Sequence, residues 1–159
     1  MPLLQPGDEF PALSVPLADG DALQLPDALA GRYGVVLFYR GSWCPYCNAQ
    51  LRAFERAHDA LAEVGAAVVA LSVDDAETTR ALVEKHHLRF PVGHSADAAK
   101  IAAATGAFVN ADRGHLESTG FVLAPSGAVV VSVYSSGAIG RLVPEDVVGL
   151  IRYLRSPAA

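Results

Sequence analysis

The hydrophobic positions of the chain divide it into alternating strand-like and helix-like segments. Residues 35–39 (VVLFY) form a continuous run of β-forming side chains, which is typical of a strand buried on both faces. A helix is predicted to begin near Pro45, because a proline in the first turn loses no hydrogen bond, and to end before Gly65. The inward stripe of this predicted helix comprises Leu51, Phe54, His58 and Leu61.

The middle of the chain continues the alternation. Residues 66–73 predict a second buried strand, and residues 76–87 a helix that the pair Asp74-Asp75 can cap. Residues 90–92 predict a short extended piece. A further helix is expected over residues 96–104, before Gly106.

The last third of the chain contains a hairpin signal and a final helix. Two β-rich runs, 120–123 and 128–134, flank a Pro-Ser-Gly turn at 125–127, so we expect an antiparallel pair. The last helix is predicted to start at Pro144. The expected buried face of this helix comprises Val147, Val148, Ile151 and Leu154.

The order of these elements predicts an α/β fold with helices on both faces of a central mixed sheet. The first 30 or so residues are rich in proline and glycine, which predicts an irregular N-terminal arm with a short hairpin. The chain has no internal repeat, low-complexity tract or linker. We therefore expect residues 1–159 to form a single domain.

Composition and charge narrow the function classes. Of the 159 residues, 52% are hydrophobic and 18% charged, enough to bury a core without disulfide bonds. The net charge of −5 and the lack of a basic stripe argue against nucleic acid as a partner. The apolar runs are too short to span a membrane, and no cation precedes Arg32 as a signal peptide would need. We expect a cytoplasmic protein with reduced thiols.

The only two cysteines, Cys44 and Cys47, form a Cys-x-x-Cys motif where the first buried strand gives way to a helix. Backbone N–H groups at a helix N-terminus favour a thiolate, which is the reactive form of cysteine. The spacing puts both sulfurs on one side of the first turn, so one thiol can attack a substrate and the other can resolve the product. The alternatives are a zinc site shared between two chains and a pair of inert core cysteines.

The five histidines do not indicate a metal site. His86 and His87 are adjacent and point about 100° apart on a helix. His58 is expected to be a core or boundary side chain, and His94 and His115 lie in loop-like sequence and are expected to be solvated. No glycine-rich nucleotide motif occurs, so no cofactor is expected.

Residues 37–48 (LFYRGSWCPYCN) resemble the active-site stretch of peroxiredoxin-like proteins of the alkyl hydroperoxide reductase/thiol-specific antioxidant group, which have a thioredoxin-like fold. The resemblance covers nearly the whole chain and includes residues 6–11 (PGDEFP), 71–74, 88–92, 121–127 and Gly140-Arg141. It implies a thiol peroxidase that reduces hydroperoxides through a Cys44–Cys47 dithiol/disulfide cycle. It also implies a thioredoxin- or glutaredoxin-type reductant.

The chain departs from the family pattern at several positions. Aligned on Cys47, Arg40 and Cys44 stand where typical peroxiredoxins have a proline and a threonine. A family arginine would fall near Ser118, and the cis-proline of thioredoxins near Thr119. Arg141 matches a second family arginine beside the active site, although a solvent-facing arginine would fit the sequence as well. The supporting site residues that the resemblance implies are Trp43, which would shield the cysteines, Arg40, Thr119 and Arg141.

The roles of the two sulfurs depend on the analogy. Thioredoxin logic makes Cys44 the exposed nucleophile and Cys47 the resolver, whereas the peroxiredoxin alignment makes Cys47 peroxidatic. The chain itself favours Cys44 as the more accessible thiol. Alternative functions are a protein disulfide reductase and a non-enzymatic redox sensor or binding module. Arg141 beside the sulfurs would count against the sensor, and both a monomer and a homodimer fit the sequence.

Overall fold

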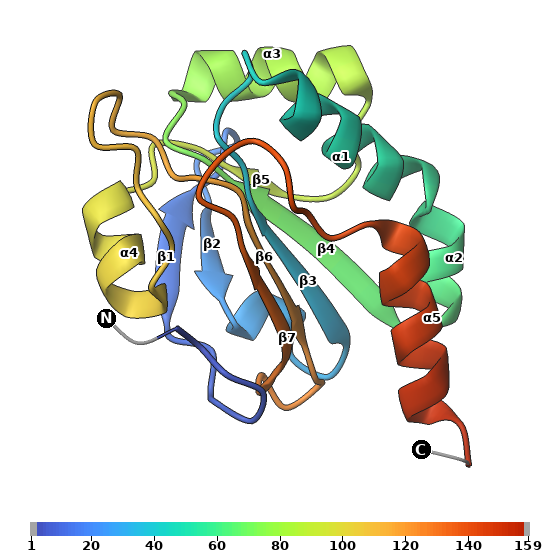
Figure 1. Cartoon of the computed structure of the whole chain (residues 1–159). Helices are drawn as coiled ribbons and strands as arrows, with labels where there is room; N and C mark the ends of the chain where they lie inside the picture. Colours follow the sequence, from blue (N-terminus) through green and yellow to red (C-terminus); the bar gives the residue numbers. More distant parts are fainter. Residues whose placement is uncertain (1–2, 158–159) are drawn as a thin grey trace.

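The computed structural model describes residues 3–157 and is built around a five-stranded mixed sheet (Figure 1). In sheet order the strands are β5 (Val92–Gly93), β4 (Ala66–Leu71), β3 (Tyr33–Phe38), β6 (Thr119–Leu123) and β7 (Val129–Tyr134). Strand β3 is parallel to β4 and antiparallel to β6, which pairs antiparallel with β7. The predicted α/β class, mixed sheet and hairpin are therefore confirmed, and the fold is thioredoxin-like.

Helices cover both faces of this sheet. They are α1 (Pro45–Arg56), α2 (His58–Glu63), α3 (Ala76–His86), α4 (Ala98–Thr105) and α5 (Pro144–Arg155). Helices α1, α2 and α5 lie on one side, and α4 lies on the other with the hairpin of β1 (Leu13–Pro16) and β2 (Ala22–Leu25) (Figure 1). A single 3-10 turn, η1 (Asp27–Leu29), leads into β3. Among residues 3–157, no helix has the length and apolar character needed to cross a membrane.

The core has two layers because side chains alternate along the central strand. Val35 and Leu37 of β3 pack with α1 and α5, whereas Val36 and Phe38 pack on the opposite side with Phe121 of β6. The Phe38 and Phe121 rings meet edge to face with centroids 5.5 Å apart. The continuous apolar run at 35–39 thus reflects burial on both faces, as predicted.

The helix expected from Pro45 to Gly65 is interrupted at Ala57, where α1 ends and α2 begins. Because the break changes the helical phase, His58 no longer lies on the same buried face as Leu51. Its side chain is 47% exposed, and its expected place in the core or at its boundary is wrong. In α5, Leu154 is only half-buried beside its three buried partners.

The predicted cap of α3 is confirmed for one aspartate only. Asp75 Oδ1 accepts the Thr78 N–H at 2.8 Å and caps the helix. Asp74 Oδ2 instead accepts the Ser42 N–H at 2.8 Å, which ties the end of β4 to the turn after β3. The predicted arm contains the β1–β2 hairpin, and residues 1–2 of it lie outside the described part of the chain.

Candidate active site

The chain leaves β3 through a tight turn and enters α1 at Cys44. The Cys44 N–H donates to the Gly41 carbonyl at 3.1 Å, and Cys44 adopts the extended conformation of an N-cap before Pro45. A Cβ on Gly41 would lie 2.2 Å from Trp43 Nε1, so glycine lets the indole pack against the turn. The strand-to-helix placement of the motif is as the sequence predicted.

The two cysteine side chains are free thiols that lie 2.7 Å apart. The Cys44 sulfur accepts the Cys47 N–H at 3.3 Å, and Cys47 Sγ accepts the Arg40 N–H at 3.3 Å. Both cysteines are 0% exposed. The expectation that Cys44 is the more accessible thiol is therefore wrong, because its place at the helix end is covered as fully as that of Cys47.

The two thiols differ in their ease of ionisation. Burial opposes ionisation of Cys44. Hydrogen bonds from the Cys47 thiol and the Cys47 backbone N–H act in the other direction, as do the guanidinium groups of Arg141 and Arg40. Together they lower the pKa of Cys44 below its ordinary value. Burial and the hydrogen bond to Cys44 raise the pKa of Cys47, against the opposing effects of Arg40 and Arg141. Cys44 is thus the thiol of the pair that ionises more readily.

Arg141, in the loop before α5, contacts both sulfurs. Its Nη2 lies 3.0 Å from Cys47 Sγ and 3.6 Å from Cys44 Sγ. Nη1 donates to Gln50 Oε1 at 2.9 Å, and Nε to the Ala138 carbonyl at 2.7 Å. Arg141 is therefore not a solvent-facing arginine. A simple redox sensor does not need an arginine beside its sulfurs, so this position counts against that alternative.

Gln50 is a buried partner of Arg141 that the sequence did not single out. Besides accepting from Arg141, it donates from Nε2 to the Leu142 carbonyl at 2.9 Å, so it holds both the guanidinium and its loop. The only signal in the sequence is the place of Gln50 one turn after Cys47. Its burial and its contact with Arg141, 91 residues away, depend on the fold.

Replacing Gln50 with leucine is expected to slow oxidation of the thiol pair by hydrogen peroxide by about 10-fold, the effect of losing one hydrogen bond to a charged group. The pKa of Cys44 should rise, since Arg141 would be less firmly held. Stopped-flow measurement of sulfenic acid formation checks this. The matched control is Gln24→Leu on the exposed side of β2, which should leave the rate unchanged. Equal rates for both variants would contradict the role of Gln50.

The structure places the other predicted site residues at different distances from the thiols. Trp43 is 43% exposed beside Cys44, and the Arg40 guanidinium lies 5.0 Å from its ring centroid. Thr119 is buried at the start of β6, and its hydroxyl donates to the Glu117 carbonyl at 3.1 Å. Among residues 3–157, no hydrogen bond joins Thr119 to either cysteine.

His115 corrects a further expectation. It was expected to be solvated, yet it is 3% exposed and its Nε2 lies 2.8 Å from Glu117 Oε1. Trp43 covers it edge to face, with ring centroids 5.0 Å apart. Loop-like sequence predicted exposure here, but this loop folds back against the active-site turn.

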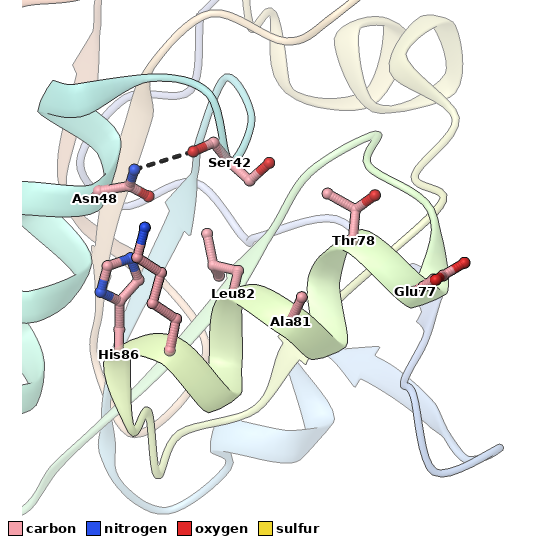
Figure 2. A pocket seen from close by; sticks show the side chains of 8 residues that line it. Ser42, Asn48, Glu77, Thr78, Ala81, Leu82 and His86 are labelled. Atoms are coloured by element: carbon pink, nitrogen blue, oxygen red, sulfur yellow. Dashed lines mark hydrogen bonds between the residues drawn. The ribbon is translucent and has the colours of Figure 1, made fainter.

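A groove of about 400 Å³ lies between α1 and α3, next to the thiol site but separate from it. Figure 2 shows Asn48 and Ser42 at one wall, joined by the Asn48 amide, which donates to the Ser42 carbonyl at 2.9 Å. Neither cysteine lines the groove. The described residues also hold no group of three or more histidine, cysteine, aspartate or glutamate side chains suited to a metal ion.

Comparisons with known proteins agree on one family. The model of the AhpC/TSA family matches residues 6–132. A peroxiredoxin of Methanothermobacter thermautotrophicus is 29% identical over 98% of this chain and 74% of its own length. Rv2521 of Mycobacterium tuberculosis, which bears the name peroxiredoxin, is 31% identical over 87% of this chain and 90% of its own.

Solved structures share the fold. Peroxidoxin BcpB from Mycobacterium tuberculosis superposes with a TM-score of 0.83 at 21% identity, covering 96% of this chain and 99% of that one. AhpC of Mycobacterium bovis gives a TM-score of 0.80 at 23% identity, covering 98% of this chain and 95% of that one.

Proposed function

Because this chain belongs to the AhpC/TSA family and is a thiol-dependent peroxidase that reduces hydroperoxides, we propose that Cys44 is the attacking thiolate and Cys47 the resolving thiol. The observation that carries this assignment is the position of Cys44 Sγ, which caps α1 and accepts the Cys47 N–H at 3.3 Å. The pKa of Cys44 is accordingly lowered, whereas burial raises that of Cys47. A nucleophile needs the ionised form, and the resolving thiol needs it only in the second step.

In the first step, the Cys44 thiolate attacks one oxygen of the hydroperoxide. A sulfur–oxygen bond forms, the oxygen–oxygen bond breaks, and a proton completes the alcohol or water that leaves. Cys44 is thereby oxidised to a sulfenic acid. The Arg141 guanidinium, within reach of both sulfurs, stabilises the negative charge that moves from sulfur to the leaving oxygen.

In the second step, the Cys47 sulfur attacks Cys44 and expels water, so that a sulfur–sulfur bond replaces the sulfur–oxygen bond. The short separation of the two side chains supports this step without a second subunit. A dithiol reductant of the thioredoxin or glutaredoxin type then returns both thiols by exchange. We place the cycle in the cytoplasm, where such reductants keep thiols reduced.

Single-turnover oxidation of the reduced protein by hydrogen peroxide tests this function. Trp43, the only tryptophan, adjoins Cys44 and serves as a fluorescence probe. We expect two thiols to disappear for each peroxide consumed, at a rate about 10²-fold or more above that of free cysteine. The product should be an intramolecular disulfide by mass spectrometry.

A rate no faster than free cysteine would overturn the proposal. If such a protein reduced insulin disulfides rapidly, the disulfide reductase alternative would replace it. Protein alkylated at both cysteines before mixing is the control, and its fluorescence should not change with peroxide.

A further inference from the structure

The loop before β6 carries two buried titratable side chains that the thiol chemistry above does not use. His115 and Glu117 are each 3% exposed. One oxygen of Glu117, Oε1, accepts from Arg40 Nε at 3.1 Å and lies 2.8 Å from His115 Nε2. A carboxylate this far from water needs such donors, because an unpaired buried charge is strongly destabilising.

The pairing of Arg40 with Glu117 follows from strand register. Strands β3 and β6 are antiparallel, and Phe38 lies opposite Thr119 at the end of the pair. Two residues further on, the same register brings Arg40 opposite Glu117. The ion pair therefore lies across the two inner strands, just beyond the carboxyl end of β3, although its partners are 77 residues apart in sequence.

Two hydrogen bonds fix the backbone of Glu117 just before β6. Its N–H donates to the Phe108 carbonyl at 2.8 Å, and its carbonyl accepts the Thr119 hydroxyl at 3.1 Å. The carboxylate is thus a rigid acceptor, and His115 restrains it from the other side.

Arg40 extends from this anchor to the thiol site. Its backbone N–H donates to Cys47 Sγ at 3.3 Å, and its guanidinium helps to lower the pKa of Cys44. The Arg40 guanidinium also lies 5.0 Å from the centroid of the Trp43 ring. The Arg113 guanidinium lies 4.2 Å from the same centroid. Arg141 therefore contacts both sulfurs through its guanidinium, whereas Arg40 contacts Cys47 Sγ through its backbone and places its guanidinium over Trp43, the residue before Cys44.

The geometry points to Glu117 as a positioning residue that, braced by His115, holds the Arg40 guanidinium beside Cys44 for the attack on the hydroperoxide. This role rests on the proposed function, in which Cys44 is the attacking thiolate. Glu117 offsets part of the Arg40 charge. A guanidinium held beside the sulfur nevertheless stabilises a thiolate more than one that moves freely in water, since its orientation requires no reorganisation during the reaction.

A double-mutant cycle tests the role through Arg40. Glu117→Ala and Arg40→Ala are each expected to slow sulfenic acid formation by about 10-fold, as for loss of a hydrogen bond to a charged group. The double variant should be no slower than either single variant. Titration of the thiolate absorbance should show the pKa of Cys44 raised in all three proteins. Glu117→Gln, which keeps an oxygen acceptor for Arg40, should restore most of the rate.

Additive losses in the double variant, or a Glu117→Ala protein as fast as wild type or faster, would overturn the role of Glu117. If Glu117→Ala does not fold, Glu117→Leu replaces it in the same cycle, because leucine fills the space that alanine leaves. The matched control is Glu55→Gln, which removes the charge of a half-buried carboxylate paired with Arg89 away from the thiols. Its rate should equal that of wild type.

The outcome separates this inference from the proposed function. A wild-type protein that reacts no faster than free cysteine removes the proposed function itself. A fast wild type with an additive cycle removes only the role of Glu117.

Discussion

Replacing Cys44 with serine is expected to slow the reaction with hydrogen peroxide by about 10³-fold or more, because the remaining thiol, Cys47, stays buried, and burial raises its pKa and keeps it mostly protonated. Replacing Cys47 with serine is expected to preserve the first step and abolish the second. The serine hydroxyl and the backbone N–H at position 47 can still donate to Cys44. A sulfenic acid should then accumulate on Cys44, detectable by dimedone labelling and mass spectrometry.

The pH dependence of the Cys47→Ser variant supplies a second readout. The thiolate is the reactive form, so the rate should rise with pH through the pKa of Cys44 and then level off. Since that pKa is lowered, the midpoint should lie below that of free cysteine. Thermal unfolding of both variants serves as the control for folding. Dimedone labelling of the Cys44→Ser protein, with none in Cys47→Ser, would reverse the two roles in favour of the peroxiredoxin alignment.

Replacing Arg141 with alanine is expected to reduce the rate of sulfenic acid formation by about 10²- to 10³-fold, the effect of removing one preorganised donor from a developing negative charge. The midpoint of the pH–rate profile should move to higher pH, because a cation that favours the Cys44 thiolate is lost. Arg141→Lys should recover only part of the rate, since an ammonium lacks the fork that reaches both sulfurs and Gln50.

Arg152→Ala is the matched control for this prediction. Arg152 lies on α5, its side chain is 63% exposed, and its pair with Glu63 is 4.0 Å long. Exposed pairs of this kind contribute little to stability, so the variant should fold and react like wild type. An Arg141→Ala protein with an unchanged rate and midpoint would show that Arg141 only packs against the site.

The sequence was most informative where the structure depends on neighbours in the chain. The run at 35–39, the proline after Cys44 and the three-residue spacing to Cys47 together predicted the strand, the helix and the thiol pair. Each of these features is set within about a dozen residues. The place of Arg141 came from the family resemblance, and the structure adds its contacts with the sulfurs.

Features that depend on distant segments could not be predicted in the same way. The pairing of Arg40 with Glu117 needs the register of two strands, which no local pattern reports. His115 was misjudged because burial of a loop depends on what it folds against, here the Trp43 indole. The expected burial of His58 was wrong for a different reason, because the break at Ala57 changed the helical phase.

Cys44 is both the proposed nucleophile and the N-cap of α1, and this double use links redox state to the folding of the helix start. In the reduced protein the Cys44 sulfur accepts the Cys47 N–H at the positive end of the helix, which favours its thiolate form. After oxidation the sulfur is neutral, and this favourable charge is gone. On the proposed assignment, each catalytic cycle removes and then restores one charge–dipole interaction at the first turn of α1.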